Sequence, residues 1–134
     1  MRTTSALKTC LIDDDNVYVF GMKKLLELGK LTDHVMEFYN GLDAITFFRN
    51  NPEHEDLPDL IFLDINMPGM NGWEFLENFI SLPVKKEITI YMVSSSINEE
   101  DKMKASSFGA IKEYITKPVT LAALKEIFST QSPN

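Results

Sequence analysis

Apolar and polar positions along the chain follow two different patterns in turn. Short runs such as LIFL at 60–63 and ITIYMV at 88–93 are almost wholly apolar, which is typical of parallel strands covered by helices on both faces. Between these runs, apolar residues recur every three or four positions, which predicts amphipathic helices. The expected strands are 8–13, 34–39, 60–64, 88–93 and 111–115, and the expected helices are 16–28, 41–51, 72–81, 99–108 and 120–128.

Five strand-and-helix units in alternation predict an α/β fold, a doubly wound (βα)5 sheet of five parallel strands with helices on both faces. A chain of 134 residues can hold one domain with a proper core. We expect residues 1–134 to form a single domain, with a core at about 7–129 and short tails at both ends. The residues expected to face the sheet from the helices are Val19, Met22, Leu26, Leu42, Ile45, Phe48, Trp73, Leu76, Ile80, Met103, Phe108, Leu121, Leu124 and Phe128.

Composition and charge narrow the class of protein. The net charge of −7 argues against a general nucleic-acid binder, because that role usually needs a basic face. The single cysteine, Cys10, excludes an intrachain disulfide and indicates a reducing compartment. The N-terminal segment lacks the apolar core of a signal peptide, and no apolar run is long enough to span a membrane. We therefore expect a cytoplasmic protein that binds neither nucleic acid nor membranes.

Polar side chains gather where the predicted strands end. In a doubly wound sheet the binding site lies beyond the carboxyl ends of the strands, near the point where the strand order reverses. Carboxylates, hydroxyls and one ammonium group are thus expected at one rim. The residues are Asp13-Asp14-Asp15 after the first strand, Asp64 on the third, Ser94-Ser95-Ser96 after the fourth and Thr116-Lys117-Pro118 after the fifth.

Several carboxylates in one crevice need a counter-charge. Two of them ~4 Å apart repel by roughly 4 kcal/mol at an effective dielectric constant of about 20. Oxygen ligands with room for water suit Mg²⁺, and Mn²⁺ can substitute for it. A crevice that combines Mg²⁺ with Lys117 and Ser94 is suited to phosphate, and a carboxylate such as Asp64 can act there as a nucleophile that forms an aspartyl phosphate.

Four segments carry a family resemblance: LIDDD at 11–15, LIFLDINMPGMNG at 60–72, MVSS at 92–95 and YITKP at 114–118. In this order, and each at a strand end, they resemble the receiver domain of two-component response regulators, of which the chemotaxis regulator is a single-domain example. The resemblance covers about residues 8–128. It implies a flavodoxin-like sheet with strand order 2-1-3-4-5 and a bacterial, stand-alone receiver.

The resemblance also implies a role for each acidic residue. Asp64 would take a phosphoryl group from a phosphohistidine on a sensor histidine kinase or a histidine phosphotransfer protein. Asp14 and Asp64 would bind Mg²⁺ through their carboxylates, and Asn66 would bind it through its backbone carbonyl. Asp13 would act mainly through metal-bound water. Such a protein catalyses only its own phosphorylation and dephosphorylation and has no separate substrate.

The remaining implied roles concern phosphoryl binding and switching. Ser94 and Lys117 would bind the phosphoryl oxygens, and the Lys117–Pro118 bond is often cis in the family. Movement of Ser94 would let Tyr114 rotate inward and reshape the surface of the fourth helix, fifth strand and fifth helix, where a downstream protein would bind. Ser96, like Asn66, flanks the site in the family. The implied assembly is a monomer or a weak dimer.

Other interpretations of the same residues stay open from the sequence alone. Asp64 could cap the helix after it, and Asp15 could cap helix 16–28. A phosphatase of the haloacid-dehalogenase type would use Asp13 as its nucleophile, but the chain offers only Glu126 where that class needs an acidic pair after the lysine. A phosphate-independent adaptor is a third possibility. Register alone does not separate Ser94 from the two serines after it.

Overall fold

The computed structural model describes residues 7–95 and 98–131. All strand pairs are parallel, and they form one sheet in the order β2-β1-β3-β4-β5. This order confirms the flavodoxin-like, doubly wound fold. The strands are β1 (Leu7–Ile12), β2 (Thr32–Phe38), β3 (Leu60–Asp64), β4 (Thr89–Ser94) and β5 (Ile111–Thr116). The helices are α1 (Asn16–Leu28), α2 (Gly41–Asn50), α3 (Gly72–Phe79), α4 (Glu99–Ser107) and α5 (Leu121–Ser129).

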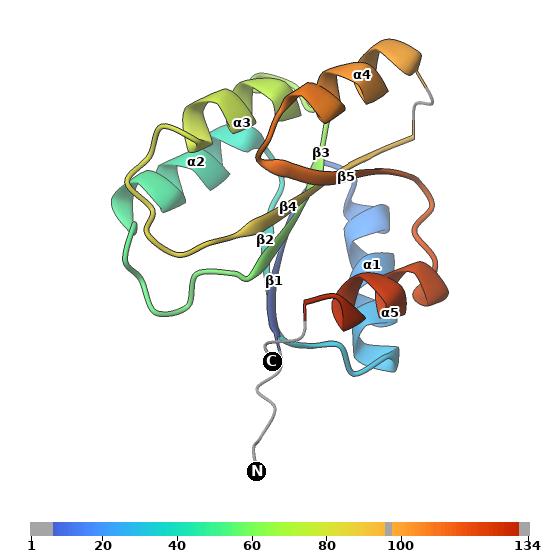
Figure 1. Cartoon of the computed structure of the whole chain (residues 1–134). Helices are drawn as coiled ribbons and strands as arrows, with labels where there is room; N and C mark the ends of the chain where they lie inside the picture. The colour runs from blue at the N-terminus through green and yellow to red at the C-terminus, as the bar shows by residue number, and fades with distance from the viewer. Residues whose placement is uncertain (1–6, 96–97, 132–134) are drawn as a thin grey trace.

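Helices cover both faces of the sheet. Figure 1 shows α1 and α5 on one face and α2, α3 and α4 on the other. Each face has its own apolar cluster, so the core consists of two layers separated by the sheet. The central strand β3 is buried along its whole length, as its apolar sequence predicts.

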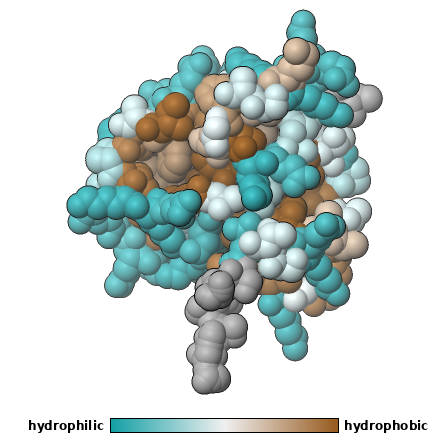
Figure 2. Space-filling view, viewed as in Figure 1, coloured by the Kyte–Doolittle hydropathy of each residue, from teal (hydrophilic) through white to brown (hydrophobic). Residues whose placement is uncertain are grey.

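The outer surface is mixed in polarity. In Figure 2, apolar residues reach the surface in the part of the view occupied by α2 and α3, and hydrophilic residues border them. Over residues 7–95 and 98–131, no helix has both the length and the apolar character that crossing a lipid bilayer requires.

Three apolar side chains that were expected to face the sheet are exposed instead: Leu42 at 58%, Ile80 at 55% and Met103 at 69%. Leu42 lies in the first turn of α2 and lines a groove between that helix and the β3–α3 loop. Ile80 follows the last residue of α3, so the helical stripe has already ended. In α4 only Ala105 is buried, because the sequence EEDKMKASS offers no continuous apolar stripe.

The register of the sheet brings the predicted polar residues together. Ile12 pairs with Leu63, so Asp13 and Asp64 are the next residues on adjacent strands. Ser94 pairs with Thr116 across β4 and β5, and Lys117 is the residue after that pair. The carboxyl ends of these strands therefore form one rim, at which the strand order reverses beside β1.

Candidate functional site

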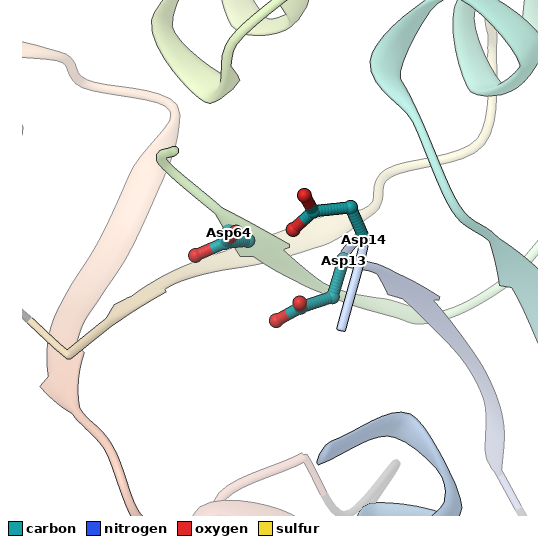
Figure 3. A group of neighbouring side chains, drawn as sticks. All are labelled: Asp13, Asp14 and Asp64. Atoms are coloured by element: carbon teal, nitrogen blue, oxygen red, sulfur yellow. The ribbon is translucent and has the colours of Figure 1, made fainter. Parts of the chain in front are cut away.

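Three carboxylates meet at this rim. One oxygen from each of Asp13, Asp14 and Asp64 lies within 4.8 Å of the others. Figure 3 shows the three side chains gathered at the ends of β1 and β3. Asp13 and Asp64 are buried, with 2% and 6% of their surface exposed, whereas Asp14 is exposed. The cluster is thus open to solvent on the side of Asp14.

Lys117 is the cation of the site. Its Nζ lies 2.8 Å from Asp13 Oδ2 and 3.7 Å from Asp64 Oδ1, and its side chain is only 16% exposed. Its backbone N–H donates to the carbonyl of Ser94 at 2.8 Å, which fixes the β5–α5 loop to the end of β4. The Lys117–Pro118 peptide bond is cis, as the family resemblance implies.

Burial dominates the electrostatics of the two inner carboxylates. Burial, with a smaller contribution from the charge of Asp13 and against the effect of Lys117, raises the pKa of Asp64 from 3.8 to about 6. Burial also raises the pKa of Asp13, against the hydrogen bonds that this carboxylate accepts from Lys117 and from the backbone N–H of Asp15. Lys117 alone therefore does not offset the free-energy cost of keeping both buried carboxylates ionised.

The donor set fits a small divalent cation. Asp13, Asp14 and Asp64 offer only oxygen ligands, which Mg²⁺ prefers, and the exposed side of the cluster leaves room for water in the coordination shell. A cation would also relieve the repulsion that raises the pKa of Asp64. Asn66 lies exposed in the β3–α3 loop, two residues beyond the strand end, and the role of its carbonyl stays a prediction.

The two predicted switch residues lie near each other. Ser94 is fully buried at the end of β4, and Tyr114 lies on the neighbouring strand β5. Burial raises the pKa of Tyr114, and the nearby side chain of Ser94 opposes the increase. Ser95 is exposed, and Ser96 lies outside the described residues.

The loop after β3 depends on close backbone packing. The backbone N–H of Gly72 donates to the carbonyl of Ile65 at 2.8 Å, which folds the start of α3 back against the strand end. A Cβ at Gly72 would lie 2.3 Å from the carbonyl oxygen of Asp64, so only glycine fits here. Within the loop, Gly69 has a φ of +78°, a conformation that favours glycine.

Two alternative interpretations are resolved by the helix caps. Asn71 caps α3 in a capping box with Glu74, so Asp64 is not the cap of that helix. Asp15 accepts from the N–H groups of Val17 and Tyr18 and caps α1, one of the interpretations that the sequence left open. The side chain of Asp15 is therefore engaged at a helix end and is not part of the carboxylate cluster.

One residue at the site was missed by the sequence analysis. The Nζ of Lys117 lies over the ring of Tyr18, 4.1 Å from its centroid. Tyr18 is in the first turn of α1, three residues after the Asp15 cap. The only sequence signal for it is this position directly behind the acidic segment, and helical periodicity does not distinguish Tyr18 from a surface residue.

Comparison with known proteins gives one consistent picture. The family model described as "Response regulator receiver domain" matches residues 9–129. The chain is 30% identical over 134 residues to hybrid signal transduction histidine kinase L of Dictyostelium discoideum, covering 95% of this chain but only 7% of that protein. A two component response regulator from Cytophaga hutchinsonii superposes with a TM-score of 0.85 at 28% identity, covering 95% of this chain and 97% of the other. The phosphorylated cyanobacterial phytochrome response regulator RcpA gives a TM-score of 0.76 at 29% identity, with 95% and 91% covered.

Proposed function

Because this chain belongs to the response regulator receiver family, we propose that Asp64 accepts a phosphoryl group from a phosphohistidine, in a reaction that requires Mg²⁺. Receiver domains are phospho-accepting signalling modules that histidine kinases phosphorylate, and they are not enzymes with a separate substrate. The donor proposed here is a sensor histidine kinase or a histidine phosphotransfer protein. We also propose that the core at 7–129 is the single receiver domain of this chain.

In the proposed step, a carboxylate oxygen of Asp64 attacks the phosphorus atom. The new bond joins that oxygen to phosphorus, and the bond between phosphorus and the histidine nitrogen breaks. The bonding electron pair leaves with the nitrogen, and a proton already on the other ring nitrogen, or one taken from water, makes the leaving group a neutral imidazole. Asp64 suits this role because it ends the rigid central strand and its carboxylate stands at the open rim.

Other residues of the chain would hold the cation and the transferred group. Asp13, Asp14 and Asp64, with the backbone carbonyl of Asn66, are the proposed magnesium ligands, with Asp13 acting mainly through bound water. When bound, the cation would supply positive charge that neutralises the phosphoryl oxygens and orients them. Lys117 would donate from its ammonium group to a phosphoryl oxygen, as a second fixed positive charge.

Switching would begin at Ser94. Its side chain, which now lies near Tyr114, would turn to a phosphoryl oxygen and leave space beside the tyrosine. Tyr114 would then change its rotamer and alter the surface of α4, β5 and α5, where a downstream protein partner would bind. A few kcal/mol of differential stabilisation is enough for such a change.

The observation that carries this proposal is the meeting of three carboxylates with a partly buried lysine at the carboxyl-end rim of the sheet. An ordinary solvated turn would leave such acids exposed and unpaired, whereas Asp13 and Asp64 are buried together with one cation. The raised pKa of Asp64 is a further mark of a functional carboxylate.

Intact-protein mass spectrometry tests the proposal directly. The full chain and its Asp64→Asn and Asp13→Asn variants are incubated with acetyl phosphate, with Mg²⁺ or with a chelator. We expect one alkali-labile phosphoryl adduct on the wild-type protein, dependent on Mg²⁺ and absent from Asp64→Asn. An adduct that survives in Asp64→Asn but is lost in Asp13→Asn would instead indicate phosphatase-like chemistry. A wild-type protein that forms no adduct and binds no beryllium fluoride would favour the phosphate-independent adaptor.

A further inference from the structure

We propose that Tyr18 is a positioning residue for the phosphoryl-transfer reaction, and that the face of its ring holds the ammonium group of Lys117 in place. This inference rests on the proposed function, because Lys117 matters here as the group that receives the phosphoryl oxygens. The observation behind it is the 4.1 Å distance from Lys117 Nζ to the ring centroid. That distance is well inside the range of about 6 Å over which a cation and an aromatic ring attract each other.

The ring and the lysine are each fixed by independent contacts. The backbone N–H of Tyr18 donates to Asp15 Oδ1 at 3.1 Å, so the first turn of α1 is fixed where the ring emerges. Pro118 and Val119, directly after Lys117, line the same hollow of about 300 Å³ as Tyr18. Tyr18 therefore lines the same hollow as the loop that carries Lys117, and its ring also lies under the ammonium group.

The ring, rather than the hydroxyl, is the part of Tyr18 that acts on Lys117. Among the side chains that the structure describes, the Tyr18 hydroxyl is the one buried polar group without a hydrogen-bond partner. Burial, together with the charges of Asp13 and Asp64, raises the pKa of this phenol, so it stays neutral. A neutral ring attracts the ammonium group without adding a fourth negative charge to the cluster.

This neutrality matters during the proposed reaction. In the structure Lys117 is held by Asp13 and Asp64, which are also the proposed magnesium ligands. When these carboxylates turn to a cation, they hold the lysine less strongly, and a long flexible side chain then has many rotamers to choose from. The ring of Tyr18 does not bind the metal, so it keeps attracting the ammonium group toward the position where the phosphoryl oxygens arrive.

The experiment compares four full-length proteins: wild type, Tyr18→Phe, Tyr18→Leu and Phe20→Leu. Tyr18→Phe keeps the ring face, and Tyr18→Leu removes it. Phe20→Leu is the matched control, because Phe20 is 62% exposed on the same helix and its ring pairs with Lys24 at 5.3 Å rather than with Lys117. The initial rate of adduct formation from acetyl phosphate with Mg²⁺ is measured for each, together with Mg²⁺ affinity by calorimetry and the thermal midpoint.

We expect Tyr18→Leu to lower the rate by about three- to tenfold, and Tyr18→Phe to restore it to within about twofold of wild type. Phe20→Leu should match wild type, and the Mg²⁺ affinity of Tyr18→Leu should not fall. Equal rates for Tyr18→Leu and Tyr18→Phe would overturn the inference. A parallel loss of Mg²⁺ affinity in Tyr18→Leu would also overturn it, because it would show a general collapse of the site. If wild type itself formed no adduct, the proposed function would fail rather than the role of Tyr18.

Discussion

Replacing Asp64 by asparagine should make the metal-free protein more stable. The side chain of Asp64 is 7% exposed and shares its surroundings with two other carboxylates and a single cation. The ionised carboxylate of Asp64 is therefore destabilised in the folded state, whereas in the unfolded chain water solvates it freely. Asparagine keeps the shape of the side chain and removes the charge, so the folded state should lose a repulsion and little packing.

The size of the effect follows from the pKa of Asp64. A rise from 3.8 to about 6 corresponds to roughly 3 kcal/mol of lost stability at neutral pH, since each pKa unit is worth about 1.4 kcal/mol. This net shift already includes the attraction between Asp64 and Lys117, whose charged atoms are 3.7 Å apart, so the attraction is not counted again. We therefore expect a net gain in the free energy of unfolding on the order of 1–3 kcal/mol.

The raised pKa of Asp64 also sets the direction in which the free energy of unfolding changes with pH. Between pH 3.8 and about 6 the folded state holds a proton on Asp64 that the unfolded state has lost. The free energy of unfolding should therefore fall as the pH rises through this window, which is the reverse of the usual behaviour of a salt-bridged aspartate. The raised pKa of Asp13 adds to the same slope, so the informative quantity is the difference between wild type and variant.

Urea denaturation in the presence of a chelator, at pH 5 and pH 7.5, measures the free energy of unfolding and its dependence on pH. Asp33→Asn is the control, because Asp33 is an exposed carboxylate on β2, and its effect should stay within about 0.5 kcal/mol. The stability gain of Asp64→Asn should be largest at pH 7.5 and shrink at pH 5. A variant that is less stable than wild type at pH 7.5, or one that keeps the wild-type pH slope, would refute this electrostatic account of the site.

Three further perturbations test other parts of the site. Gly72→Ala should destabilise the fold by about 1–3 kcal/mol and slow phosphorylation, because the added Cβ would meet the backbone of Asp64. Its control is Gly21→Ala, because Gly21 lies in the middle of α1 with open space around it. In the same urea assay Gly21→Ala should stabilise the fold by about 0.5–1 kcal/mol. Lys117→Ala should cost on the order of 3 kcal/mol at pH 7.5 without metal, and less at pH 5, because it leaves Asp13 buried without its cation. Calorimetric scans of wild type should show Mg²⁺ adding about 1.4 kcal/mol at ten times its Kd, and a smaller increase in Asp64→Asn.

The fold could be predicted from the sequence because most elements carry strong local signals. Helix 16–28 and strand 60–64 agree with the structure at both ends, since Asp15 caps the first and the second is a wholly buried apolar run. The ends of the other elements differ from the prediction by at most two residues. Periodicity failed for Leu42 and Met103, because it does not report how far the sheet extends beneath a helix.

The site was predictable in its strand-end residues but not in the contacts among them. Parallel topology alone places Asp13, Asp64 and Lys117 at one rim. It does not say that Lys117 pairs more closely with Asp13 than with Asp64, because this depends on side-chain rotamers. The ring of Tyr18 escaped prediction for the same reason, since its contact joins a helix turn to a loop about a hundred residues away in the chain.

Each group with a proposed part in phosphoryl binding already has a partner in this structure. Lys117 is held by two carboxylates and a ring, and Ser94 is buried near Tyr114. Phosphorylation would thus exchange existing interactions for new ones, and the free-energy difference between the two states would be the small remainder. Three carboxylates and one ammonium group leave two negative charges, which a divalent cation balances. Adding or removing one phosphoryl group can therefore shift the equilibrium between the two states of such a site. A reversible signalling module needs this property.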